Sequence, residues 1–409
     1  MRGSLLMTVS VSEMLVRLNQ MIGTQNGTAN MLEKAFKYMG KEMLEEVAEL
    51  KKLEKKGTKN PRPSETAVQW LYTCALDGRS LPADVKQGND YMIDLLTKQT
   101  SAFSIYGKAV SSVVFAKNGK AQKAKEYLQS VKEYTVYKDE MGRYFDTPKA
   151  LYSWFDYKIP TQVAAIEALR MVTPSDKQTV EELQRWLLHS KRTQAWDTPV
   201  NSVNAVYAFL NGETQKLALS NESMSTLKVD GKNLEMSKPT AGLGYVKSSM
   251  TGSPFRELTV NKTSQGTSWG AVYAQFMQKN SEIVDASSGL TVSREVLNGD
   301  RELKIGDKVR VRITIQAERD YDFVQVVDKR AACLEPTQQL SGYHWGYYCS
   351  PKDYTTNYYF DRLAKGKHQI ETEYYVDRIG TYQTGTCTIQ CAYSPEYSAR
   401  TAGKVLIVK

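Results

Sequence analysis

The sequence predicts an α+β protein that consists of an N-terminal array of helical hairpins and a C-terminal antiparallel β-sandwich. Up to about Gly212, apolar residues recur at steps of three or four, which is the period of an amphipathic helix. Beyond Gly212 the apolar period changes to two, which is typical of strands with one buried face. A chain of 409 residues is also too long for one ordinary core. We therefore expect a helical domain at residues 1–212 and a β-sandwich region at residues 213–409.

Proline and glycine residues divide the helical half into segments. The longest apolar stripe covers residues 32–50, and Pro61 and Pro63 end that segment. Ser64 follows as an N-cap for the next helix. Further helices are expected at residues 9–21, 67–75, 82–98, 102–117, 120–135, 161–172, 176–190 and 199–211. Short turns between such helices predict antiparallel hairpins packed side by side, as in a partial α/α toroid.

Short strands separated by turn residues make up the second half. Turn signals recur roughly every ten residues, as in antiparallel sandwiches. The final stretch carries the clearest alternation, with His368, Ile370, Tyr374 and Val376 on one parity. Strands are expected at residues 226–229, 255–260, 269–277, 290–297, 308–317, 323–328, 366–376, 381–392 and 405–408. In the helical half, residues 139–146 predict one short β-hairpin.

Charge and hydropathy exclude two classes of partner. The net charge is +9, but the basic residues are interspersed with acidic ones, as in residues 41–46 and 49–56. No basic patch with interleaved aromatic residues occurs, so we expect no nucleic-acid partner. No apolar run is long enough to span a membrane, and residues 1–8 are too short and too weakly basic for a secretory signal. The chain is therefore expected to be cytosolic or to lack its natural start.

The sequence offers no recognisable catalytic or cofactor motif. Its three histidines, His189, His344 and His368, lack metal-ligand spacing, so we expect no metal site. Nucleotide-binding and serine-nucleophile motifs are also absent, and we predict no cofactor.

Paired carboxylates leave one enzymatic alternative, because α/α toroids occur among glycosidases and acids on rim loops could perform general acid–base catalysis. The candidate acids and the aromatic residues near them are Asp139, Glu140, Asp146, Asp197, Trp154 and Trp196. The competing interpretation is that these acids cap helices and turns, and that the aromatic residues pack between helices.

The cysteines suggest two disulfide bonds. Cys74 lies on an apolar helical stripe and is interpreted as a core residue. Cys387 and Cys391 are four apart on one predicted strand, hence about 13 Å apart and unable to bond to each other. Cys333 and Cys349 are available as their partners, an arrangement that suits an oxidising compartment. The alternative is four unrelated, reduced cysteines.

An aromatic segment precedes Cys349. Tyr343, Trp345, Tyr347 and Tyr348 are the candidates for a solvent-facing patch that contacts a glycan or a protein. The alternative is a long loop of the sandwich whose aromatic residues have no binding role.

Several segments of the second half resemble the closing part of bacterial α2-macroglobulins. The most specific are Asp320-Tyr-Asp-Phe-Val-Gln-Val-Val-Asp328, Ala331-Ala-Cys-Leu-Glu-Pro336 and Tyr393-Ser-Pro-Glu396. Residues 289–294, 303–311, 358–363 and 380–382 also match. In the helical half, residues 195–207 resemble the closing element of the family's thioester-type toroid, and residues 1–8 are similar to a segment from its middle.

This resemblance implies a C-terminal fragment of a larger protease-trapping polypeptide. Residues 1–212 would be a thioester-type toroid without its first part, and residues 213–409 a linking sheet with a terminal macroglobulin-like domain. The bait region, the thioester and any membrane anchor would lie upstream of Met1. The fragment would be structural, without catalytic residues, and would meet target proteases only through the full-length protein in the periplasm or at the cell surface. The alternatives are a toroid glycosidase or lyase with an accessory β-domain, and a surface scaffold that binds a glycan or a protein.

Overall fold

The computed structural model describes most of the chain. The described residues are 4–99, 103–146, 158–193, 196, 198–211, 225–235, 248–252, 255–263, 270, 272–273, 275, 277–297 and 302–409. The chain forms two compact units, which are residues 1–188 with 196–268, and residues 189–195 with 269–409. The domain boundary predicted at residue 212 lies outside the described residues.

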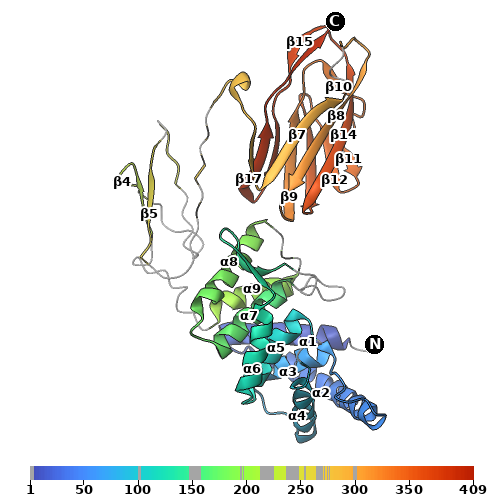
Figure 1. The fold of residues 1–409 in the computed structure, drawn as a ribbon, viewed down its shortest axis with the longest axis vertical. Coiled ribbons are helices and arrows are strands. Elements are labelled where there is room, and N and C mark those ends of the chain that lie inside the picture. The colour runs from blue at the N-terminus through green and yellow to red at the C-terminus, as the bar shows by residue number, and fades with distance from the viewer. Residues whose placement is uncertain are drawn as a thin grey trace. The chain divides into compact units, whose positions relative to one another are not determined.

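Helical hairpins form the N-terminal part, as the sequence predicts (Figure 1). The helices are α1 (Leu5–Ile22), α2 (Asn26–Lys55), α3 (Glu65–Asp77), α4 (Ala83–Leu96), α5 (Ile105–Lys117), α6 (Ala121–Lys132), α7 (Lys158–Val172), α8 (Lys177–Thr193) and α9 (Pro199–Leu210). Helices α1, α3, α5, α7 and α9 each contact the next in this order, and α9 contacts α1. These five helices therefore form a closed ring, and α2 packs against α1 outside it.

Local sequence signals set the ends of these helices. The Ser64 hydroxyl accepts a hydrogen bond of 3.0 Å from the Ala67 amide, so Ser64 is the predicted N-cap of α3. Gly78 ends α3 in the left-handed conformation, with φ of 71°. Thr198 caps α9 in the same way as Ser64, directly before Pro199 at the first helical position.

Between α6 and α7 the chain forms the predicted β-hairpin, made of β1 (Thr135–Lys138) and β2 (Gly142–Phe145). After α9, strands β3 (Thr226–Val229), β4 (Lys232–Asn233) and β5 (Leu258–Asn261) form a small separate sheet. The strand predicted at residues 269–277 was wrong for the positions that the structure describes there, namely 270, 272, 273, 275 and 277. Alternating residues alone do not make a strand where no neighbouring strand pairs with them.

Two antiparallel sheets form the predicted β-sandwich (Figure 1). The four-stranded sheet has the order β10-β14-β8-β7, and the seven-stranded sheet has the order β11-β12-β13-β9-β16-β17-β6. Strands β15 and β18 pair separately. The strands are β6 (Ala286–Ser288), β7 (Leu290–Leu297), β8 (Lys308–Ala317), β9 (Tyr321–Lys329), β10 (Leu334–Pro336), β11 (Gly342–His344), β12 (Tyr347–Pro351), β13 (Thr355–Leu363), β14 (Gly366–Val376), β15 (Gly380–Gln383), β16 (Cys387–Cys391), β17 (Ser394–Thr401) and β18 (Val405–Val408).

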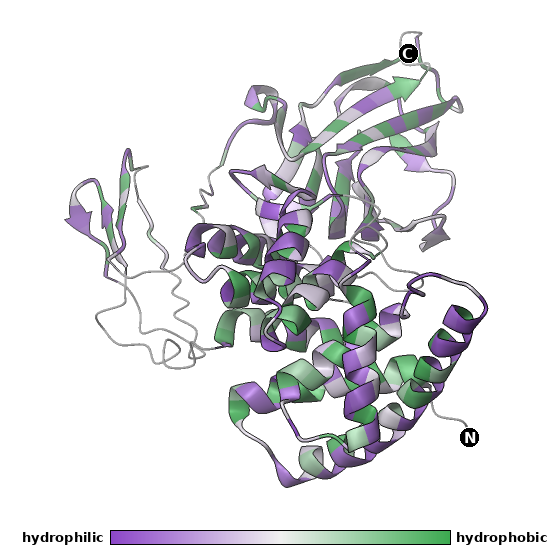
Figure 2. Ribbon diagram, turned by 60° about the horizontal axis from the view of Figure 1, so that its bottom comes forward, coloured by the Kyte–Doolittle hydropathy of each residue, from purple (hydrophilic) through white to green (hydrophobic). Residues whose placement is uncertain are grey.

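Strict alternation places one face of each sheet in a shared core. Along β8, every second residue from Val309 to Ala317 is buried, and Val324 and Val326 of β9 are buried in the same core. Figure 2 shows the corresponding alternation of hydrophilic and hydrophobic residues along strands of the sandwich. The α+β class with a C-terminal antiparallel sandwich is therefore confirmed.

One predicted strand is in fact two. Residues 381–392 divide into β15 and β16, which belong to different sheets. Gly385 lies between them, where a Cβ atom would stand 2.4 Å from the Cβ of Lys329. The tight approach of the chain to β9 at this glycine ends one strand before the other begins.

Candidate functional sites

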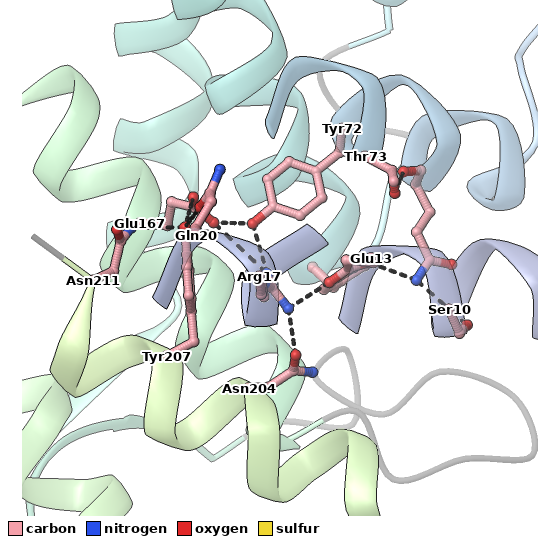
Figure 3. A network of polar contacts seen from close by, with 12 residues as sticks. Ser10, Glu13, Arg17, Gln20, Tyr72, Thr73, Glu167, Asn204, Tyr207 and Asn211 are labelled. Carbon is pink, nitrogen blue, oxygen red and sulfur yellow. Dashed lines mark hydrogen bonds and ion pairs between the residues drawn. The ribbon is translucent and has the colours of Figure 1, made fainter. Parts of the chain in front are cut away.

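In the part of the chain that the structure describes, three places concentrate chemically active side chains: the interior of the helical ring, the core of the sandwich and the β11–β12 hairpin. The helical-ring network comprises residues from each of the five ring helices. These residues are Glu13, Arg17, Gln20, Gln69, Tyr72, Tyr106, Glu167, Asn204, Tyr207 and Asn211. Figure 3 shows most of them converging around Arg17.

Arg17 is the centre of this network and is fully buried. Its Nη1 lies 2.5 Å from Glu13 Oε1 and donates a 2.6 Å hydrogen bond to Asn204 Oδ1. Its Nη2 donates a 2.6 Å hydrogen bond to the hydroxyl of Tyr72 and lies 3.7 Å from Glu167 Oε2. Burial alone would lower the pKa of Arg17, but the negative charges of Glu13 and Glu167 raise this pKa well above its ordinary value.

Both carboxylates of the network are shielded from solvent, with exposures of 3% for Glu13 and 5% for Glu167. Glu13 Oε2 accepts hydrogen bonds from Gln69 at 2.7 Å and from Tyr106 at 3.0 Å. Glu167 accepts one from the Tyr72 hydroxyl, and its Oε1 lies 2.8 Å from the Tyr207 hydroxyl. Because these acids pair with Arg17 and with tyrosines in a buried interior, the network ties the ring together and presents no acid to a substrate.

The tyrosines of the network are held neutral by their surroundings. Burial raises the pKa of Tyr72 well above its ordinary value, and the charge of Arg17 opposes this shift only in part. Burial and then the charge of Glu167 raise the pKa of Tyr207. Both phenols therefore act as hydrogen-bond donors at neutral pH.

Sequence reasoning missed this network. A signal was present in α1, where Glu13 and Arg17 stand four residues apart on one face of a mostly apolar helix. The acids proposed for glycosidase chemistry lie elsewhere. Asp139 and Glu140 are exposed in the β1–β2 turn, and Asp146 is exposed directly after β2. They lie on the surface of a hairpin and not inside the helical ring, because turn acids are stabilised by solvent.

The remaining members of that proposed site are Trp154, Asp197 and Trp196. Trp154 and Asp197 lie outside the described residues. Trp196 packs against the helical core, as the structural interpretation predicted.

In the sandwich core, Arg294 of β7 pairs with Asp328 of β9 at 2.7 Å. The Arg294 Nη2 also donates hydrogen bonds to the Thr384 hydroxyl at 2.6 Å and to the Gly385 carbonyl at 2.7 Å. Burial raises the pKa of Asp328, and the charge of Arg294 opposes this rise. The pair therefore joins the two sheets and the segment between β15 and β16.

The five cysteines are free thiols in the structure, so the two predicted disulfides do not form there. The order of strands in the sheet explains why Cys349 cannot form a disulfide with Cys387 or Cys391. Its strand β12 is separated from β16, which carries Cys387 and Cys391, by β13 and β9. Three strand spacings amount to about 14 Å, twice the separation of α-carbons that a disulfide tolerates. Burial raises the pKa of these thiols, which makes them poor nucleophiles.

The predicted aromatic segment divides between two faces of the β11–β12 hairpin. Tyr347 points toward the core, where its ring centroid lies 5.8 Å from that of Tyr358. Tyr343 and Tyr348 stand opposite each other on the other face, with ring centroids 4.9 Å apart. Trp345 lies in the turn and is fully exposed. Three of the four predicted contact residues therefore remain available at the surface.

Within the described residues, His344 and His368 make local contacts and do not form a further site. His368 Nε2 lies 2.6 Å from the Ala364 carbonyl, and His344 stacks on Tyr347 with centroids 5.2 Å apart. The described residues contain no group of three or more His, Cys, Asp or Glu side chains that could hold a metal ion. No helix within the described ranges is long and apolar enough to cross a membrane.

Helical hairpins followed by two antiparallel sheets around one core define the class as an α+β multidomain protein with a β-sandwich. Residues 277–396 match the family model described as the bacterial alpha-2-macroglobulin MG10 domain. This part of the chain is therefore an MG10 domain, and the resemblance inferred from the sequence is confirmed there.

Solved structures of the same family are similar over a wider range at low identity. Trypsin-activated alpha-2-macroglobulin from Escherichia coli has 12% identity and a TM-score of 0.48, covering 100% of this chain and 32% of that chain. The Escherichia coli protein activated by porcine elastase has 13% identity and a TM-score of 0.37, with coverages of 84% and 36%. Salmonella alpha-2-macroglobulin reacted with methylamine has 14% identity and a TM-score of 0.33, with coverages of 100% and 26%.

The family assignment applies to residues 277–396 and rests on the MG10 match, because the structural scores are below 0.5. No curated protein matches the chain. The chain spans only part of these three solved relatives, namely 32%, 36% and 26% of their lengths.

Proposed function

We propose that this chain is the C-terminal part of a bacterial α2-macroglobulin-type inhibitor, which traps proteases after they cleave a bait region. The observation that carries this proposal is the MG10 match at residues 277–396, placed after a domain of helical hairpins. Within such a protein, the chain supports the trap and does not perform the chemistry itself. Target proteases are its partners through the complete polypeptide.

The polar interior of each unit supports a structural role. In the helical ring, Arg17 joins Asn204 of the last ring helix to Glu13 of the first. In the sandwich, Arg294 and Asp328 join the two sheets. A protein loses much of its stability when one partner of such a buried ion pair is removed. We therefore infer that each unit resists local deformation. A trap that rearranges after cleavage requires such rigid parts.

The same proposal places the chain outside the cytoplasm, in the periplasm or at the cell surface. The presence of a thioester in the complete polypeptide is a separate property from trapping. No described site favours the glycosidase or lyase alternative.

The test uses the longest natural polypeptide that carries this chain. It is incubated with trypsin or elastase, and the protease is then assayed on a small peptide substrate and on a large protein substrate. Trapping predicts that hydrolysis of the small substrate persists, that hydrolysis of the large one falls, and that the protease co-elutes with the inhibitor on gel filtration. Methylamine incorporation, measured by intact mass, reports a thioester separately.

The matched control is the same polypeptide treated with a protease whose active site has been blocked covalently before mixing. Because bait cleavage triggers trapping, the blocked protease should elute alone. Equal inhibition of both substrates, or complete digestion without retained protease, would refute the trapping function.

A further inference from the structure

The outer face of the seven-stranded sheet carries a row of tyrosines that the helical and core sites do not use. We define the aromatic row as Tyr343, Tyr348 and Tyr359, which stand directly opposite one another on β11, β12 and β13. Their ring centroids are 4.9 Å apart for the first pair and 6.5 Å apart for the second. Tyr343 is 82% exposed and Tyr359 is 40% exposed.

Uncharged polar side chains continue this row across the next three strands. Tyr359 is opposite Gln325 of β9, Gln325 is opposite Gln390 of β16, and Gln390 is opposite Ser398 of β17. The Gln325 amide lies 3.5 Å from the Tyr359 hydroxyl. Six strands at a spacing of about 4.8 Å give the row a length of about 24 Å.

The row on the other side of Tyr359 contains the carboxylate of Asp361, but the row toward Asn357 is also uncharged over four strands. It contains Ser350, Asn357, Val327 and Thr388, all within the described residues, and meets its first charge at Arg400 of β17. The outer face of the other sheet is different, because ion pairs cover it. Examples are Lys308 with Glu373 at 3.1 Å and Arg312 with Glu371 at 2.6 Å.

The difference in charge between the two outer faces indicates the chemistry of a partner for the seven-stranded sheet. An anionic polymer would require basic side chains along these two rows. The basic residue that they meet, Arg400, lies only at the β17 end. A protein partner would favour a dry apolar centre with a polar rim, whereas here amides and hydroxyls continue directly from the exposed rings. Aromatic rings beside neutral hydrogen-bonding groups match a neutral ligand that has apolar ring faces and hydroxyl edges.

We propose that the aromatic row binds a neutral polysaccharide chain laid across the strands. Sugar rings stack on Tyr343, Tyr348 and Tyr359, and their hydroxyls exchange hydrogen bonds with Gln325 and Gln390. Trp345, fully exposed in the turn between β11 and β12, adds a further aromatic ring close to the row. This site is independent of protease trapping, and neither proposal requires the other.

The experiment is native affinity electrophoresis of this 409-residue chain through gels that contain one soluble polysaccharide. The probes are a mixed-linkage β-glucan, a xylan and a galactomannan, with alginate as an anionic comparison. We expect at least one neutral polysaccharide to retard the chain and alginate to have no comparable effect. Retardation by alginate alone, or by none of the four, would overturn the proposal.

Substitutions locate the binding surface. Tyr343→Ala and Tyr359→Ala should each weaken retardation by about tenfold, because each removes a stacking ring. Tyr343→Phe should retain binding, since the ring face is kept. The matched control is Tyr375→Ala, which removes a tyrosine of 42% exposure from the outer face of the other sheet. Circular dichroism checks that each variant is folded.

Two further outcomes count against the site. If Tyr375→Ala weakens binding as much as Tyr359→Ala does, the polysaccharide does not bind at the aromatic row. If sedimentation shows that the chain self-associates and that Tyr343→Ala abolishes this association without any retardation by polysaccharide in the unsubstituted chain, the row is a contact between copies of the chain.

Discussion

Arg294 on β7 and Asp328 on β9 form a salt bridge of 2.7 Å that joins the two sheets inside the sandwich. The side chains of both residues are almost completely shielded from solvent. The remaining donors of Arg294 bind Thr384 and Gly385, so one guanidinium organises three segments of the domain. Because both charges are buried, this contact makes the stability of the sandwich sensitive to the protonation of Asp328.

Asp328 should make the sandwich less stable as pH rises above the ordinary pKa of an aspartate. Burial raises the pKa of Asp328 in the folded state, so between its unfolded and folded pKa values the folded state binds more protons. Its contribution to the free energy of unfolding is therefore greatest at low pH and decreases as pH rises through that window. The measurement is hydrogen exchange of β7 and β9 amides between about pH 7 and pH 4.

The comparison variant is Asp328→Asn, which cannot titrate at this position. The unsubstituted chain should gain local stability relative to this variant as pH falls. Asp353→Asn, in the exposed turn between β12 and β13, controls for general charge effects and should show no such trend. A difference that stays flat, or that grows as pH rises, would contradict the assignment.

Local signals explain how much of the fold the sequence predicts. Ser64 and Gly78 define the ends of α3 through interactions within a few residues, so the sequence contains the necessary information. The alternation along β8 and β14 likewise depends only on which face of each strand is buried. The sheet to which a strand belongs cannot be predicted from such local signals. Residues 381–392 were predicted as one strand, and the close approach of Gly385 to Lys329 separates β15 from β16.

The helical-ring network shows why the candidate sites were harder to predict. Arg17 and Asn204 are 187 residues apart in the chain, and no local pattern indicates that their helices meet. The aromatic segment at residues 343–348 was identifiable because four aromatic residues lie within six positions of the sequence. Which of its rings face outward depended on the register of β11 with β12, which the sequence did not reveal.

Gly142 should not tolerate a side chain. Its φ is +80°, and a Cβ atom would stand 2.3 Å from the Glu182 carbonyl oxygen. Gly142→Ala should therefore destabilise the β1–β2 hairpin and its contact with α8 by more than about 2 kcal/mol, from both backbone strain and the clash. Thermal unfolding followed by circular dichroism measures the loss.

Gly119→Ala is the matched control for this substitution. Its φ of +72° is similar, but no atom lies within 4 Å of the added Cβ. Only the backbone cost of about 1 kcal/mol should remain. Equal losses for both variants would show that the contact with Glu182 has no effect.

The cysteines should behave as five protected thiols. Burial raises the pKa of Cys333, Cys349, Cys387 and Cys391, so little reactive thiolate exists at neutral pH. Iodoacetamide should modify the native chain slowly. After unfolding without a reductant it should add five groups, as intact mass would record. Fewer than five additions that rise to five after reduction would reveal a disulfide and refute the free-thiol arrangement.

Arg17 should be the most sensitive position of the helical ring. Arg17→Met keeps an extended apolar side chain but leaves Glu13 and Glu167 without their buried cation. Leaving such charges uncompensated costs about 3–5 kcal/mol. Because Arg17 also bonds to Asn204, the loss should appear as faster hydrogen exchange in both α1 and α9.

A second substitution tests whether charge causes this loss. Adding Glu13→Gln to Arg17→Met removes one of the two stranded carboxylates, so the double variant should be more stable than Arg17→Met alone. Lys41→Met, at an exposed position of α2, should change stability by less than about 0.5 kcal/mol. If the double variant is instead less stable by the sum of the two single losses, Glu13 and Arg17 act independently. The ring would then be held together mainly by apolar packing between its helices, with the buried ion pair contributing little to its closure.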